Sequence, residues 1–74
     1  MVSIKPVITF DDVNEIVVSM LRDTRMSMKK GKDMLSRYEI PEGTEYAIGV
    51  SNRREDFIRA LSDLLTILRA AEGE

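Results

Sequence analysis

The chain contains no cysteine, no histidine and no tryptophan. Without thiols and imidazoles it has no disulfide, no thiolate metal site, and neither the commonest general base nor the commonest activated nucleophile. Only carboxylates, amines, phenols and hydroxyls remain for chemistry. We therefore expect a protein that is not an enzyme and that needs no metal or other cofactor.

Long apolar runs are also missing, and the first ten residues include Lys5 and Pro6. This pattern predicts neither a membrane span nor an export signal, so the expected location is the cytoplasm, without membrane contact. The 74 residues are 43% apolar and 32% charged, with a net charge of −2, which indicates one folded domain over residues 1–74. Because so short a chain gains little stability from its own core, we expect a homo-oligomer.

Proline and glycine are few, and they come close together only at Pro41 and Gly43. Neither residue is comfortable inside a helix, so the pair predicts a loop over residues 39–43. Apolar residues recur at three- and four-residue spacing on both sides of this loop. The spacing predicts one long helix over residues 10–38 and a second over residues 44–71.

The start of each predicted helix carries a capping residue. Thr9 and Asp12 match a capping box before the first helix, and Thr44 can cap the second. Residues 1–9 contain Pro6 and are predicted to form an extended arm that packs on the helices or on a neighbouring subunit. The predicted fold class is therefore all-α: two long antiparallel helices, a helical hairpin, with an extended N-terminal arm.

One segment leaves an alternative fold open. Residues 44–50 alternate well enough for a strand, and Asn52 with Glu55 would then cap a shorter second helix. Such a strand would pair with residues 3–10 to give a small β-α-β-α unit. We prefer the hairpin over this alternative.

Positive charge is concentrated in the middle of this acidic chain. Positions 22–37 hold six basic residues and two acidic ones, and Arg53 with Arg54 follows. A hairpin with its loop at Pro41 brings these basic residues together as one band, which repels itself unless an anion or a partner's carboxylates neutralise it. The hairpin also places four small residues at the same level, where they would leave a hollow: Ser27, Gly31, Gly49 and Ser51. The alternative interpretation, a basic face that is simply solvated, stays open.

A compact anion such as a cyclic oligonucleotide fits this band better than duplex DNA does, because the acidic ends would repel a long polyanion. Lysine and arginine would contact its phosphates, aromatic rings would stack on its bases, and hydroxyl or amide groups would bond the base edges. The candidate ligand-binding residues are Arg22, Arg25, Lys29, Lys30, Tyr46, Ser51, Asn52, Arg53 and Phe57.

Part of the sequence resembles a known family. Residues 47–52, Ala-Ile-Gly-Val-Ser-Asn, are followed by Phe57-Ile58 and Ala60-Leu61, and an acidic-capped first helix with Arg22 precedes them. This arrangement resembles the helical-hairpin sponges that phages use against cyclic-oligonucleotide (CBASS) immunity. The resemblance implies a small oligomeric phage protein in the host cytoplasm that sequesters a cyclic-oligonucleotide signal without cleaving it and so blocks host immunity.

The resemblance also implies roles for particular residues. It places Arg22 near a ligand-contacting lysine of the family, and Tyr46 and Phe57 at the family's aromatic positions. The sequence departs from the family pattern in two places, with Ile8-Thr9-Phe10 instead of a Tyr-Arg pair and Ser51-Asn52 instead of Thr-His.

Two other functions compete with sequestration. The main alternative is a small regulatory or inhibitor protein that binds a host protein through its apolar arm, its methionine-rich face or its basic band. A dimeric DNA-binding regulator with the N-terminal segment as an intersubunit β-ribbon is the third hypothesis. The net negative charge disfavours DNA as a partner.

Overall fold

The computed structural model describes residues 4–72, and in this range it contains four helices and no strand. The helices are α1 (Phe10–Arg22), α2 (Met28–Leu35), α3 (Glu45–Val50) and α4 (Arg54–Glu72). The predicted all-α class is confirmed for these residues. Residues 1–3 of the predicted arm lie outside the described range.

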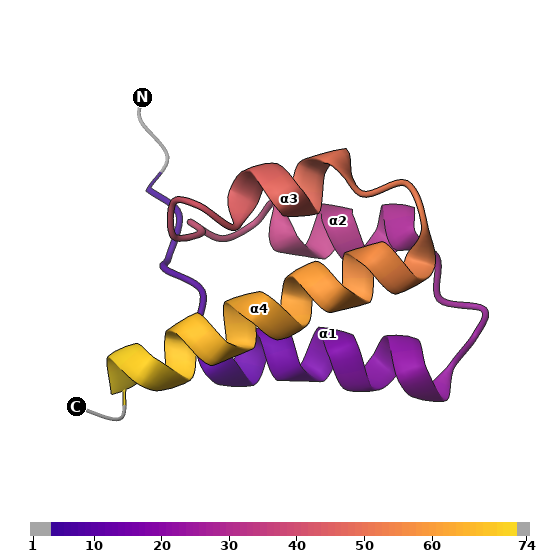
Figure 1. The fold of residues 1–74 in the computed structure, drawn as a ribbon, viewed down its shortest axis with the longest axis horizontal. Coiled ribbons are helices and arrows are strands. Elements are labelled where there is room, and N and C mark those ends of the chain that lie inside the picture. The colour runs from indigo at the N-terminus through magenta and orange to yellow at the C-terminus, as the bar shows by residue number, and fades with distance from the viewer. Residues whose placement is uncertain (1–3, 73–74) are drawn as a thin grey trace.

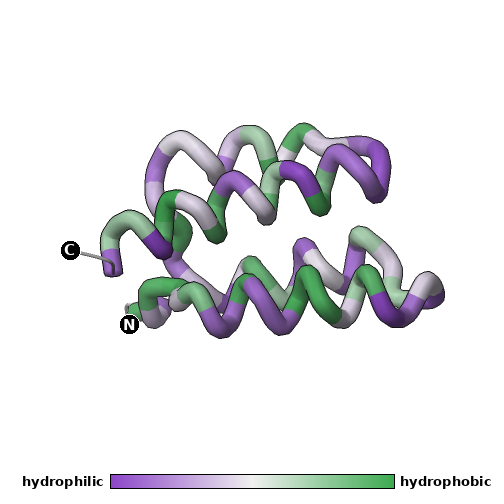
Figure 2. The backbone as a smooth tube through the Cα atoms, turned by 60° about the horizontal axis from the view of Figure 1, so that its bottom comes forward, coloured by the Kyte–Doolittle hydropathy of each residue, from purple (hydrophilic) through white to green (hydrophobic). Residues whose placement is uncertain are grey.

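Successive helices run in opposite directions, with α1 and α3 pointing one way and α2 and α4 the other (Figure 1). The long helices α1 and α4 lie side by side in opposite directions, and α3 also packs on α4. Hydrophobic and hydrophilic residues alternate in short stretches along the chain (Figure 2), as helices with one buried face require. The buried side chains form one cluster: Ile8, Val13, Ile16, Val17, Met20, Leu35, Ile48, Phe57, Ala60, Leu61, Leu64 and Leu68.

The capping box predicted at the start of α1 is confirmed. The Thr9 hydroxyl accepts a hydrogen bond from the Asp12 amide at 3.3 Å, and the Asp12 carboxylate accepts one from the Thr9 amide at 3.0 Å. These bonds satisfy two donors that a helix start leaves without partners. They fix where α1 begins and therefore which of its faces meets α4.

The predicted continuous helix over residues 10–38 is wrong, because the chain leaves the helical path between α1 and α2. Asp23 ends α1 in an extended conformation, and its carboxylate accepts a hydrogen bond from the Arg25 amide at 3.0 Å. Ser27 then starts α2 as an N-cap, accepting from the Lys30 amide at 3.1 Å. Short polar side chains that bond nearby amides compete with the helix in this way, and apolar spacing does not reveal it.

The predicted continuous helix over residues 44–71 is wrong as well. It is divided into α3 and α4 by an interruption at residues 51–53, where Ser51 is extended with φ −66° and ψ 130°. The strand proposed for residues 44–50 is also wrong, since Glu45–Val50 is helical. Thr44 occupies the N-cap position of α3, but its hydroxyl donates to the Pro41 carbonyl instead of capping the helix.

The N-terminal arm pairs with the connection between α2 and α3 through an isolated parallel bridge between Val7 and Glu39. The Ile8 amide donates to the Glu39 carbonyl at 3.0 Å, and the Glu39 amide donates to the Pro6 carbonyl at 2.8 Å. Ile8 is buried in the core, whereas Ile4 and Val7 stay exposed. The arm therefore packs on its own chain through Ile8 and leaves the other two apolar side chains in solvent.

Candidate functional site

Arg54, a member of the predicted basic band, holds the break between α1 and α2. Its guanidinium donates to the backbone carbonyls of Met20, Met26 and Asp23, the last at 3.1 Å. Carbonyls at a helix C-terminus have no partner within the helix, and a charged donor satisfies them strongly. Arg54 is thus a structural cation, since three of its hydrogen bonds go to backbone carbonyls of this connection.

Lys32 plays the same part at the end of α3. Its ammonium donates to the carbonyl of Ser51 at 2.9 Å and to that of Gly49 at 3.3 Å. A cation at a helix C-terminus also meets the negative end of the helix dipole. Lys32 therefore ties α2 to α3, although nothing in the sequence distinguishes it from the neighbouring lysines.

Four other cations form an exposed group at the junction of α1 and α2, and we call them the cationic cluster: Arg22, Arg25, Lys29 and Lys30. A hollow of about 440 Å³ lies there, lined by Arg22, Arg25 and Lys30. The other residues that line it are Ser19, Asp23 and Met26, so that one carboxylate faces three cations. This hollow is more basic than the one between α3 and α4, whose two arginines are matched by two aspartates.

The charges of the cationic cluster are poorly balanced within the chain. Arg25 pairs with Asp23 at 3.2 Å, but within the described residues Arg22, Lys29 and Lys30 have no carboxylate within ion-pair distance. Lys29 and Lys30 also sit in the first turn of α2, which contains no acidic residue. Helix N-termini favour negative charge, so these two lysines are placed against the dipole. An anion bound at this junction would offset both effects.

Phe57 does not belong to any ligand site, which corrects the prediction for this residue. Its side chain is fully buried in the core, and a Cβ atom built on Gly31 would lie only 2.8 Å from its Cε2 atom. The small residue on α2 therefore admits the phenyl ring, and the predicted hollow at Gly31 is filled. Gly49 is exposed, and a Cβ atom there would meet nothing within 4 Å.

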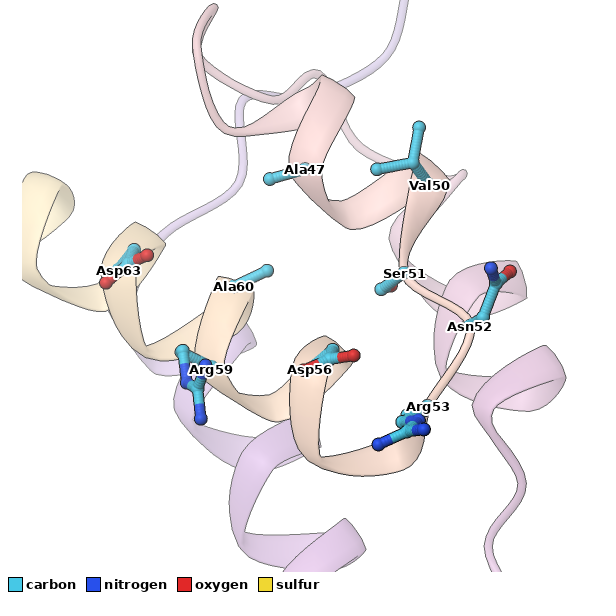
Figure 3. A pocket seen from close by; sticks show the side chains of 9 residues that line it. All are labelled: Ala47, Val50, Ser51, Asn52, Arg53, Asp56, Arg59, Ala60 and Asp63. Carbon is cyan, nitrogen blue, oxygen red and sulfur yellow. The ribbon is translucent and has the colours of Figure 1, made fainter.

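Three predicted residues line a second hollow, which lies between α3 and α4 (Figure 3). Ser51 is buried and its hydroxyl donates to the Ile48 carbonyl at 2.7 Å, while Asn52 and Arg53 are exposed. The structure thus divides the predicted site. Arg22, Arg25 and Lys30 line one hollow, Ser51, Asn52 and Arg53 line another, and Tyr46 on α3 is exposed and lines neither.

Sequence reasoning missed most of the residues around the second hollow. They are Ala47, Val50, Asp56, Arg59, Ala60 and Asp63. The three charged ones follow Arg53 at spacings of three and four residues, with alternating sign. That spacing places them along one side of a helix, so the pattern was present in the sequence.

Among residues 4–72 no three acidic side chains come together as a metal site would need. None of the described helices combines the length and the apolar character that crossing a membrane requires.

Comparison of the chain with protein-family models, curated proteins and solved structures gives no match. Function is therefore inferred from the chain's own residues.

Proposed function

We propose that this chain is a non-enzymatic binding protein that sequesters a phosphate-bearing small molecule at the cationic cluster. One observation carries the proposal: Arg22, Arg25 and Lys30 line the same hollow. The one carboxylate that lines it with them is that of Asp23. Phosphate oxygens accept bidentate hydrogen bonds from arginine and point-charge contacts from lysine. The hollow, of about 440 Å³, has the size of a small-ligand site.

The resemblance to phage sponges makes cyclic dinucleotides and trinucleotides the first ligands to test. On this hypothesis the protein is phage-encoded, acts in the host cytoplasm as a homo-oligomer, and blocks host immunity by withholding the signal. Binding without turnover suits a chain that lacks histidine and cysteine.

The test is isothermal titration calorimetry with a panel of cyclic oligonucleotides and linear nucleotides. We expect Arg22→Glu and Lys30→Glu each to weaken binding by about tenfold or more, because each replaces an attraction by a repulsion inside the hollow. Arg37→Glu is the matched control, since Arg37 is exposed and lines a different hollow, which lies between α1 and residues 34–38. The site would be refuted if Arg22→Glu and Lys30→Glu bound the ligand with the same affinity as the control Arg37→Glu.

A second function, binding of a host protein, is favoured by one specific observation. Ile4 and Val7 on the arm are 91% and 61% exposed, although both are large apolar residues. Deleting the arm would not test this role cleanly, because Ile8 is in the core and Thr9 caps α1. The better variant is Ile4→Asp with Val7→Asp, which leaves the backbone pairing with Glu39 in place. Loss of a macromolecular complex in this variant would support the second function, and an unchanged complex would exclude the arm.

A further inference from the structure

The hollow between α3 and α4, which we call the α3–α4 groove, has a floor of small side chains and a charged rim. Ala47 from α3 and Ala60 from α4 lie in it, together with Ser51, whose hydroxyl already donates to a backbone carbonyl. Figure 3 shows the rim on α4, where Asp56, Arg59 and Asp63 come from successive turns. An apolar centre within a polar rim is the usual anatomy of a protein interface.

The rim charges alternate in sign and do not satisfy one another. In the order of the chain they are Arg53, Asp56, Arg59 and Asp63. Spacings of three and four residues permit ion pairs along a helix, yet within residues 4–72 none of Asp56, Arg59 and Asp63 has an opposite charge within 4.0 Å. Arg53 reaches only Glu55, at 3.8 Å between exposed side chains. Pairs of that kind contribute little and exchange readily.

From this arrangement we infer that the α3–α4 groove is the surface through which two copies of the chain associate, with their α4 helices antiparallel across a two-fold axis. An axis near residue 58 sets Asp56 of each copy against Arg59 of the other. The same axis sets Arg53 of each copy against Asp63 of the other. Every rim charge then meets its opposite, as the self-complementary surface of a two-fold dimer requires.

Exposed apolar side chains near the rim also favour a second copy of the chain as the binding partner. Val50 lines the groove and is 51% exposed, and Tyr46, one turn earlier on α3, is 77% exposed. Ile67 is 43% exposed and follows Ala60 and Asp63 at helical spacing on α4. The dimer would cover apolar surface that the single chain leaves in water.

This inference supplies the surface for the homo-oligomer stated with the proposed function, and it does not depend on anion binding. The test is sedimentation equilibrium over a wide range of protein concentration. We expect wild type to dimerise and the dimer to weaken as salt is raised. Asp56→Arg and Arg59→Asp should each raise the dimer dissociation constant by about tenfold or more, because each places like charges together twice in the dimer.

The double variant Asp56→Arg with Arg59→Asp exchanges the two charges, restores their pairing across the axis and keeps the net charge of −2. We expect it to dimerise like wild type. Arg37→Asp, which changes the charge as Arg59→Asp does but lies outside the groove, should also dimerise normally. Circular dichroism of each variant checks that the helices are retained.

Two outcomes would overturn the inference: a wild-type chain that stays monomeric at its highest soluble concentration, or a dimer that is indifferent to Asp56→Arg and Arg59→Asp. If the double variant did not dimerise like wild type, the antiparallel arrangement of the two α4 helices would also be refuted. Titration with cyclic oligonucleotides separates this result from the proposed function. A monomer that binds the ligand refutes only the interface, and a groove-dependent dimer that binds none refutes only the ligand site.

Discussion

Different forces hold α1 against α4 and tie α2 to α3. Between α1 and α4 the contact is made by large apolar side chains that are fully buried, such as Val13, Leu61 and Leu64. The pair α2–α3 contributes two buried apolar side chains to the core, Leu35 and Ile48, and relies on a lysine that bonds two carbonyls. Apolar packing thus fixes one half of the molecule, and helix-end hydrogen bonds fix much of the other.

The largest expected effect comes from breaking the apolar half. Leu61→Ala removes a side chain that is 0% exposed between α1 and α4. Lost burial and the remaining cavity should lower the free energy of unfolding by about 2–5 kcal/mol. In a domain this small such a loss leaves little stability, so chemical denaturation should show a much earlier midpoint. A midpoint within experimental error of wild type would mean that α1 and α4 do not share this core.

The second effect tests the link between the two halves. Arg54→Met keeps a long side chain but leaves the carbonyls of Met20, Asp23 and Met26 without their charged donor. Charge-assisted hydrogen bonds of this kind contribute about 1.5–3 kcal/mol, and we expect a loss of about that size in urea denaturation. The matched control is Arg37→Met, since Arg37 is exposed and its one ion pair within residues 4–72 is to Asp33, at 3.8 Å. It should change stability by less than about 0.5 kcal/mol. Equal losses in the two variants would contradict the structural role of Arg54.

A third effect compares two glycines of the α2–α3 pair. Gly31→Ala would place a Cβ atom 2.8 Å from the buried Phe57 ring and should lower the free energy of unfolding by about 1–3 kcal/mol. Gly49→Ala meets no atom within 4 Å, and the gain in helix propensity should raise stability by up to about 1 kcal/mol. Thermal melts of both variants measure the difference. A stabilising Gly31→Ala would show that the ring can move away.

The smallest effect concerns the cationic cluster. Lys29→Glu replaces a cation by an anion in the first turn of α2 and should raise the stability of the ligand-free protein by about 0.3–1 kcal/mol at low salt. The gain should shrink as salt is added. Lys29→Gln, which removes the charge without reversing it, should give an intermediate gain. A destabilised Lys29→Glu variant would mean that Lys29 supports the fold.

The sequence predicted the apolar half well, because that half follows periodic spacing. The all-α class, the start of α1 at the Thr9–Asp12 capping box and the antiparallel course of α1 against α4 all follow from local pattern. The breaks after Arg22 and Val50 do not, because apolar residues keep their helical spacing through both of them. Local hydrogen bonds of Asp23 and Ser27 favour the first break. The bonds that Arg54 and Lys32 make to the two breaks come from distant parts of the chain, which spacing does not reveal.

The candidate site shows the same limit. A straight hairpin brings Gly31 next to Ser51, but the two breaks shift the register and bring Gly31 against Phe57 instead. The spacing of residues also could not distinguish Arg54, which has a structural role, from the exposed cations. The carbonyls that Arg54 binds lie about thirty residues earlier in the chain. The concentration of positive charge was visible in the sequence. Which cations converge on a hollow was visible only in the structure.

The most direct test of the proposed function is native mass spectrometry of the purified protein, followed by denaturation and analysis of any molecule released. We predict a stoichiometric phosphorylated small molecule, or uptake of one from a panel of cyclic dinucleotides and trinucleotides, with Arg22→Glu as the variant that stays empty. A wild-type protein that releases nothing and ignores the panel would contradict sequestration. It would leave the cationic cluster as a solvated or protein-facing surface.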